Sequence, residues 1–230
     1  MFRNLKVLLA AALALTAFGA IAASAHAEDE FHCSANPCRG TLSTDGTGKE
    51  AHHVFIIENA ATTESVSFTC ESLRGDLEFA GNVAKEVTLT SIAYDNCTAN
   101  GSAGVIVDMN GCDYRFTGAG GRSEDKAEVH VECPEGKQIE ITYNGCIATV
   151  TPLRATGIGY TTKGVSPNRE VTATVNHVTI PAERIHLIGT KAQCLISVAE
   201  ERKLVGTYTT GNTLITGETT AGVMADAWYE

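Results

Sequence analysis

Eight cysteines are the residues of this chain whose type and spacing point most directly to chemistry. An even number of cysteines in an exported chain is typical of disulfide bonds. Zinc is the alternative, but the sequence has no Cys-x-x-Cys pair, and Cys33-x4-Cys38 has no His-x(3–5)-His segment nearby. The sequence therefore predicts that all eight form disulfides: Cys33, Cys38, Cys70, Cys97, Cys112, Cys133, Cys146 and Cys194.

Two adjacent histidines precede a short β-rich segment. His52 and His53 stand directly before Val54–Ile57. Adjacent residues on a strand point to opposite faces, so these imidazoles cannot form a pair on one surface once strand geometry begins. We interpret them as residues at the start of a strand.

Three other histidines have neighbours that could support metal or proton chemistry. His130 lies between Glu128 and Glu132 on the polar face of an alternating strand, where a solvated cross-strand face is the alternative to a catalytic or metal-binding trio. His177 and His186 lie on either side of a proline and would meet across a hairpin, but spacing ties no carboxylate cluster to them. We favour structural roles for all three.

One pair of carboxylates is a candidate calcium site. Asp108 and Asp113 would oppose each other across a turn at Asn110-Gly111, and such a like-charge pair costs stability. Arg115 would relieve the repulsion, and calcium is the alternative. No other metal or cofactor is expected.

The motifs of common hydrolases are missing from the sequence. It contains neither Gly-x-Ser-x-Gly nor His-Glu-x-x-His. The stretch TGAGGRSED at Thr117–Asp125 resembles a phosphate loop, but a strand rather than a helix follows it, and we interpret it as a hairpin loop. No catalytic residue is predicted.

The beginning of the chain predicts export. Arg3 and Lys6 precede an apolar run over Val7–Ala23, and Ala25-His26-Ala27 follows as a cleavage pattern. We expect a signal peptide over residues 1–27, with cleavage near Ala27, and a mature chain that is secreted or held in the cell envelope without inserting into the membrane. The formal charge of −10 becomes −12 without the two basic residues, which argues against nucleic-acid binding.

Two Asn-Gly dipeptides, each followed by cysteine, set the expected architecture, because Asn-Gly favours the two-residue turns of β-hairpins. A turn at Asn144-Gly145 gathers apolar residues on one face of its hairpin, and a turn at Asn110-Gly111 does the same. The expected pairs are Tyr143–Cys146, Ile141–Ala148, Ile139–Val150, Met109–Cys112, Val107–Tyr114 and Val105–Phe116.

The expected strands also suggest which cysteines pair. Folding residues 127–133 back on the strand after Cys112 places Val131 beside Tyr114 and Cys133 beside Cys112. A weak repeat, KEVTLT at 85–90 and REVTAT at 169–174, makes Cys70–Cys97 and Cys146–Cys194 equivalent pairs in two related halves. Cys33–Cys38 remains as a local loop closure.

Short Thr- and Val-rich segments separated by Gly, Asn or Pro predict an all-β fold, an antiparallel β-sandwich with disulfide-linked hairpins. We divide the chain into the signal peptide, an N-terminal extension over 28–47 and a sandwich over 48–230, with a repeat boundary near 134–138. The further expected strands are Val54–Ile57, Val66–Thr69, Val87–Ile92, Val171–Ile180, Ile185–Ile188, Cys194–Val198, Thr207–Thr209 and Leu214–Thr216.

The pattern FTC…DNC…MNGCDYRF…VECPEGKQIEITYNGC…GTYTT resembles a group of exported, disulfide-containing bacterial proteins of uncharacterised function. The resemblance spans most of the mature chain, apart from the Cys33–Cys38 segment, and it implies architecture but no activity.

These observations favour a non-catalytic structural or binding protein of the envelope or extracellular space. Its partner would be an envelope, glycan or protein surface. The Thr-rich segments 207–210 and 213–220 would suit a glycan or solid surface, but we favour the ordinary explanation that Thr suits exposed strand faces. A secreted hydrolase with a site assembled from loops is one alternative. A proteinase inhibitor or toxin-like effector, acting through the Cys33–Cys38 loop, is another.

Overall fold

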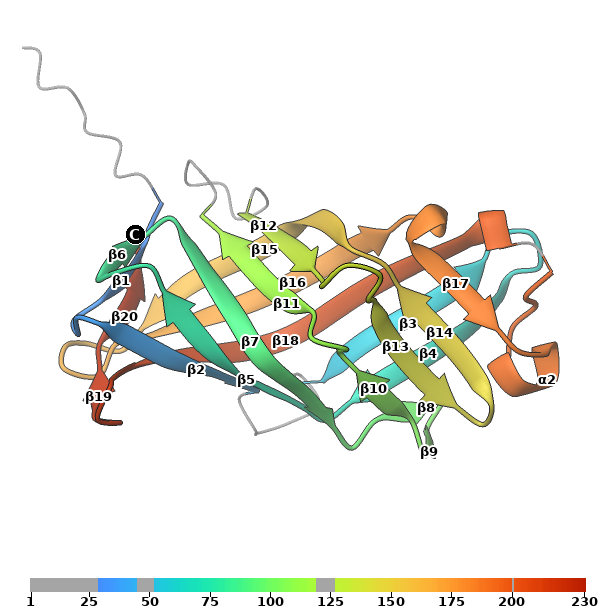
Figure 1. The fold of residues 1–230 in the computed structure, drawn as a ribbon, viewed down its shortest axis with the longest axis horizontal. Coiled ribbons are helices and arrows are strands. Elements are labelled where there is room, and N and C mark those ends of the chain that lie inside the picture. Colours follow the sequence, from blue (N-terminus) through green and yellow to red (C-terminus); the bar gives the residue numbers. More distant parts are fainter. Residues whose placement is uncertain (1–28, 45–51, 119–126, 200) are drawn as a thin grey trace, which may run out of the picture.

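The computed structural model describes residues 29–44, 52–118, 127–199 and 201–230. Within these ranges the fold is all-β apart from three short helical turns, α2 (Lys191–Cys194), η2 (Ala182–Arg184) and η3 (Glu201–Lys203). Figure 1 shows an elongated molecule with a barrel of long strands towards the left and shorter strands towards the right. The predicted signal peptide and most of the TGAGGRSED stretch lie outside the described residues.

Eight strands form a closed barrel rather than the predicted sandwich. Their order is β16-β15-β12-β11-β7-β5-β2-β18, and β18 pairs with β16 to close the sheet. Two short strands were predicted where β18 forms a single one. Because β18 is uninterrupted and has a neighbour on each side, it removes the free edges that a sandwich would keep. The barrel strands are β2 (Cys38–Thr44), β5 (Ser72–Phe79), β7 (Glu86–Asp95), β11 (Asp113–Thr117), β12 (Ala127–Glu132), β15 (Leu153–Lys163), β16 (Glu170–Ile180) and β18 (Leu204–Thr219).

Beyond the barrel, β18 exchanges one of its neighbours. Its second half pairs with β2, up to the Thr213–Thr44 pair, and its first half pairs with β3 (His53–Asn59), from Thr210–His53 onward. β3 then pairs with β4 (Glu64–Cys70), and β8 (Thr98–Ala99) and β9 (Ser102–Ala103) follow. We call these four strands the β3–β4 ribbon. β2 and β3 therefore lie end to end along a single strand.

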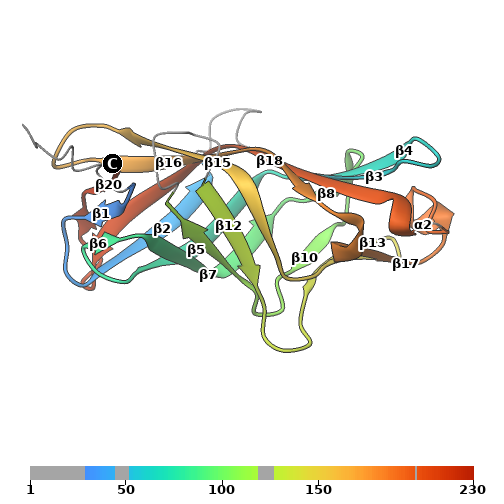
Figure 2. The same ribbon diagram turned by 90° about the horizontal axis from the view of Figure 1, so that it is seen from above.

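A separate sheet lies beyond the barrel on the other side. It contains β10 (Ile106–Asp108), β13 (Ile139–Tyr143), β14 (Cys146–Val150) and β17 (Ile185–Ile188), and we call it the end sheet. In Figure 2 the β3–β4 ribbon and the end sheet occupy opposite sides of the right-hand end of the molecule. The predicted hairpin at Asn144-Gly145 is confirmed in register, because β13 and β14 pair as expected from sequence.

The hairpin predicted at Asn110-Gly111 is wrong, although its turn forms. Both residues have positive φ, 51° and 78°, and the Cys112 N–H donates to the Met109 carbonyl oxygen at 2.8 Å. The strands on either side then diverge, since β10 pairs with β13 while β11 pairs with β7 and β12. An Asn-Gly turn fixes the local backbone, but it does not decide which strands compete for each edge. The predicted pair of Tyr114 with Val131 is confirmed.

The four disulfides join the cysteines as predicted: Cys33–Cys38, Cys70–Cys97, Cys112–Cys133 and Cys146–Cys194. Two of them lie where strands leave the barrel, because Cys70 ends β4 next to β5, and Cys112 lies between β10 and β11. Four disulfides indicate an oxidising, extracellular environment. Among the described residues, no helix has the length and apolar character that crossing a membrane requires.

The strand predicted over Cys194–Val198 is wrong. Cys194 ends α2, whose capping box joins Thr190 and Gln193 through side-chain and backbone hydrogen bonds. The chain leaves this turn through Leu195 in the left-handed conformation, which ends any regular strand geometry there. The disulfide to Cys146 then attaches α2 to the end sheet.

A small sheet lies at the left-hand end of the molecule in Figure 1. It contains β1 (Phe31–Cys33), β6 (Val83–Ala84) and β20 (Ala227–Tyr229), and β19 (Met224–Ala225) lies beside β18. Phe31 is fully buried, and its ring packs edge-on against Tyr160 of β15 with centroids 4.9 Å apart. This end of the barrel is therefore filled by aromatic side chains.

Candidate functional site

A cavity of about 120 Å³ lies between the barrel, the β3–β4 ribbon and the end sheet. Eight-stranded barrels have interiors just wide enough for packed side chains or one small ligand. The residues that line it are Leu42, His53, Phe55, Phe68, Cys70, Leu73, Tyr94, Val107, Tyr114, Phe116, Val129, Val131, Ile139, Ile141, Val150, Leu153, Ile158, Ala173, Val175, Val178, Ile180, Tyr208, Thr210 and Thr213.

Strand alternation explains why this lining is apolar. In β3 the side chains of His53, Phe55 and Ile57 are buried while those between them are more exposed, as a period of two requires.

In β18, Gly206 allows the β3–β4 ribbon and β17 to lie close together, because a Cβ there would lie 2.6 Å from the Ile185 Cδ1 and 2.9 Å from the Phe55 Cε2. Close approach of the ribbon to β17 therefore depends on a residue without a side chain.

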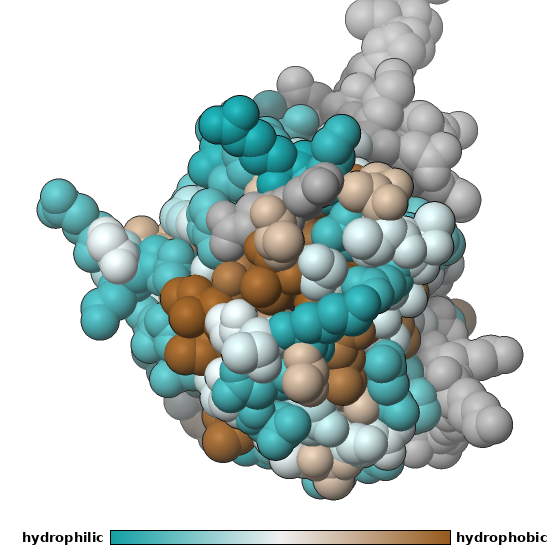
Figure 3. All heavy atoms as spheres, turned by 90° about the vertical axis from the view of Figure 1, so that its right-hand side faces the viewer, coloured by the Kyte–Doolittle hydropathy of each residue, from teal (hydrophilic) through white to brown (hydrophobic). Residues whose placement is uncertain are grey.

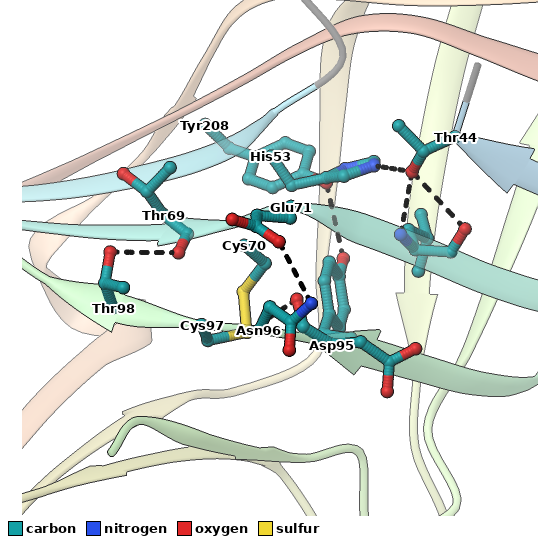
Figure 4. The surroundings of a disulfide bond; sticks show 12 residues. Thr44, His53, Thr69, Cys70, Glu71, Asp95, Asn96, Cys97, Thr98 and Tyr208 are labelled. Atoms are coloured by element: carbon teal, nitrogen blue, oxygen red, sulfur yellow. Dashed lines mark hydrogen bonds between the residues drawn. A yellow bond between two sulfur atoms is a disulfide. The ribbon is translucent and has the colours of Figure 1, made fainter. Parts of the chain in front are cut away.

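A chain of hydrogen bonds crosses this otherwise apolar site. The Thr44 hydroxyl lies 2.9 Å from the His53 Nε2, and the His53 Nδ1 lies 2.6 Å from the Tyr208 hydroxyl. The Tyr208 hydroxyl is 3.3 Å from that of Tyr94, which is 3.0 Å from that of Tyr114. Figure 4 shows His53 between Thr44 and Tyr208, near the Cys70–Cys97 disulfide. Residues from five different strands thus form one polar network.

Burial keeps this network uncharged. It lowers the pKa of His53 from 6.5 to about 4, with a smaller contribution from the charge of His52. Burial also raises the pKa values of Tyr94, Tyr114 and Tyr208 above that of an exposed tyrosine. At neutral pH the site therefore presents a neutral imidazole and three protonated phenols.

The described lining of the cavity contains no Asp, Glu, Lys or Arg. Burying an isolated charge in such surroundings is costly, so the cavity disfavours a charged ligand.

Figure 3 shows the right-hand end of the molecule, where apolar side chains are exposed in the centre and polar residues surround them. Exposed apolar residues on the elements of this end are Ile106, Ile188, Leu195 and Val205.

His130 belongs to an ion-pair network on another strand pair. Its Nδ1 lies 2.7 Å from an Arg115 nitrogen, and its Nε2 lies 3.0 Å from a Glu128 oxygen. Arg115 also pairs with Glu132, which lowers the pKa of that carboxyl, and with Glu86. The side chain of His130 is buried, not solvated as the sequence analysis expected, because the cross-strand Arg115 side chain lies against it.

The other candidate residues from the sequence are not brought together by the strand pairing. His177 lies in β16 at positive φ, and His186 lies in β17, which pairs with β14 rather than β16.

The two carboxylates of the predicted calcium site lie in different sheets, Asp108 in β10 and Asp113 in β11. Asp108 accepts a hydrogen bond from the Asn110 N–H at 2.9 Å. Burial raises the pKa of Asp113, and the charges of Glu78 and Glu132 add to the effect. Calcium binding by Asp108 and Asp113 stays a prediction, and within the described ranges no group of three or more His, Cys, Asp or Glu residues is arranged for a metal.

The cavity and its polar network were not predicted from the sequence. One signal was available, because alternation places His53 on the same face as Phe55 and Ile57, a polar residue on an apolar face. The Thr-rich array is also partly inward, since Thr210 and Thr213 are buried and line the cavity. Nothing local in the sequence connects either feature to Tyr94 or Tyr114.

Comparisons with protein-family models, with curated proteins and with solved structures gave no match. The resemblance to exported bacterial proteins therefore stays a prediction, and the site must be interpreted from its own geometry.

Proposed function

We propose that this protein is an exported, non-catalytic binding protein that holds a small apolar molecule in the cavity between the barrel, the ribbon and the end sheet. The cavity itself is the observation that carries the proposal, since apolar and aromatic side chains dominate its lining and a few polar groups converge at one place. Ligand sites commonly have this composition.

The size of the cavity limits the ligand. Its volume of about 120 Å³ is close to that of the ~150 Å³ apolar cavity that accommodates benzene in another protein. A glycan is a poor occupant, because its many hydroxyls would lose their hydrogen bonds to water among aliphatic and aromatic side chains. We therefore propose binding of a small molecule inside the cavity in place of binding to an envelope, glycan or protein surface.

The test is the melting temperature of the oxidised protein with and without p-xylene, compared with two variants. Ala173→Leu adds three carbons in the cavity, where Ala173 is buried, and Ala221→Leu adds them at an exposed position. A ligand that binds only the folded state raises the melting temperature. We expect a rise for the parent and for Ala221→Leu, and a much smaller one for Ala173→Leu.

Either of two results would contradict the proposal: no rise in the parent protein, or an equal rise in all three proteins. Ala173→Val, which adds less volume, serves if the leucine variant does not fold. An intermediate rise in that variant would support cavity binding, and a rise equal to that of the parent would oppose it.

A further inference from the structure

The polar network inside the cavity ends at Tyr114. The side chains of His53, Tyr208 and Tyr94 each lie within hydrogen-bonding distance of two other members of the network, in the order Thr44, His53, Tyr208, Tyr94 and Tyr114. Beyond Tyr94, the Tyr114 hydroxyl contacts only the Met109 sulfur within the described part of the chain, at 3.9 Å. Sulfur is a weak acceptor. Tyr114 lines the cavity, and its hydroxyl therefore retains hydrogen-bonding capacity.

The capacity of Tyr114 suits one polar atom on a ligand. A phenol hydroxyl has one proton and accepts through its lone pairs, so it can donate to a carbonyl or ether oxygen or accept from a hydroxyl. If protons run along the chain from Thr44 towards Tyr114, the last hydroxyl is a donor, and if they run the other way it is an acceptor. In both cases an uncharged oxygen on the ligand, as a carbonyl, ether or hydroxyl, can supply the matching group.

The remaining lining describes the rest of the ligand. Seven of its members carry rings, which favour edge-to-face and offset contacts with another ring. The described lining has no charged side chain that could pair with an ion. The ring-bearing residues are His53, Phe55, Phe68, Tyr94, Tyr114, Phe116 and Tyr208.

We infer that the ligand is a neutral, single-ring aromatic molecule with one hydrogen-bonding oxygen, which binds the hydroxyl of Tyr114. This inference rests on the proposed function, because it names the class of molecule that the same cavity holds. It also assigns Tyr114 as the residue that distinguishes an oxygenated ring from a plain hydrocarbon of equal size.

The experiment uses p-xylene and p-cresol, which differ by a methyl group in place of a hydroxyl, as probes in calorimetric titrations of the oxidised protein at pH 7.5. The measured quantity is the ratio of the dissociation constant of p-xylene to that of p-cresol, in which protein stability and general cavity shape largely cancel. Tyr114→Phe removes the proposed partner. Tyr160→Phe is the matched control, because Tyr160 is a tyrosine outside the cavity lining whose buried hydroxyl has no hydrogen-bond partner within the described residues.

We expect the ratio to fall about fivefold or more in Tyr114→Phe and to stay unchanged in Tyr160→Phe, since a hydrogen-bonding group left unpaired in an apolar site is penalised. We also expect 4-methylbenzoate to bind far more weakly than p-cresol, and 1-hexanol to bind more weakly than p-cresol. An unchanged ratio in Tyr114→Phe would overturn the assignment of Tyr114 while leaving the proposed function intact. Tight binding of 4-methylbenzoate would overturn the neutral class, and tighter binding of 1-hexanol the aromatic one.

Failure of both p-xylene and p-cresol to bind would overturn the proposed function and this inference together. If Tyr114→Phe does not fold, the parent protein with isotopically labelled tyrosine rings provides the second measurement. Nuclear Overhauser effects between p-cresol and the Tyr114 ring would support the assignment, and contacts of p-cresol with other cavity rings but not with Tyr114 would overturn it.

Discussion

The Nδ1 atom of His53 lies 2.6 Å from the hydroxyl oxygen of Tyr208, although 155 positions separate the two residues in the chain. The contact joins the first residue of β3 to β18 close to the point where β18 exchanges β2 for β3. A buried imidazole is thus held where the barrel sheet continues into the ribbon. Its hydrogen bonds to Thr44 of β2 and Tyr208 of β18 stabilise this junction, and His53 and Tyr208 also line the cavity.

The first prediction concerns pH. Burial lowers the pKa of His53 from 6.5 to about 4, so between these values the unfolded chain binds a proton that the folded protein does not. The free energy of unfolding should therefore fall as the pH falls from about 6.5 to about 4, by a total of about 3 kcal/mol from this residue. Urea unfolding of the parent and of His53→Gln across this range gives the contribution as a difference. Parallel pH profiles for the two proteins would refute it.

The second prediction compares two buried tyrosine hydroxyls. Tyr208→Phe leaves the His53 Nδ1 without its 2.6 Å partner and should lower the free energy of unfolding by about 1–3 kcal/mol. Tyr160→Phe removes a buried hydroxyl that has no hydrogen-bond partner in the described part of the structure, so its effect should be within about 0.5 kcal/mol or slightly stabilising. Equal losses in chemical denaturation would contradict the importance of the network.

The third prediction separates two disulfides by their position. The Cys112→Ala/Cys133→Ala variant opens a link beside Tyr114, where strands leave the barrel, and should lose about 2–5 kcal/mol of stability and bind p-xylene more weakly. The control is Cys33→Ala/Cys38→Ala, which removes a disulfide that closes a shorter loop and belongs to a separate small cluster in the parent protein. This control should lose less stability and keep the parent dissociation constant. Weaker binding in the control alone would place the site elsewhere.

The fourth prediction concerns Gly206 in β18. A methyl group there meets the side chains of Ile185, Phe55 and Ile180 at 2.6–3.1 Å, so Gly206→Ala should cost about 1–3 kcal/mol through overpacking. Gly81→Ala is the control, because its nearest contact is 3.7 Å away, and it should be neutral or slightly stabilising. Differential scanning calorimetry of both variants checks the difference. Equal melting temperatures would show that the ribbon does not pack tightly on β17.

Local features of the sequence predicted local features of the structure. The Asn144-Gly145 turn and the alternation around it determined the register from Ile139 to Val150, because both strands of that hairpin stay in one sheet. The same dipeptide at Asn110-Gly111 predicted the turn but not the partners, since β7 and β12 occupy the two edges of β11.

The closed barrel and its cavity depend on contacts between distant residues. Barrel closure requires the Val171–Ile215 pair and its neighbours, which no turn or spacing indicates. The cavity requires His53, Tyr94, Tyr114 and Tyr208 to converge from four strands, and each one alone is an ordinary strand residue. The Cys112–Cys133 pair was predictable because these cysteines adjoin two neighbouring strands, β11 and β12.

The most direct test of cavity binding is a crystal structure of the oxidised protein with 4-bromophenol, whose bromine gives an anomalous signal. We predict one strong bromine peak inside the cavity, with the phenol oxygen within hydrogen-bonding distance of the Tyr114 hydroxyl. Bromine peaks confined to the outer surface, or an empty cavity at a saturating concentration, would contradict the account.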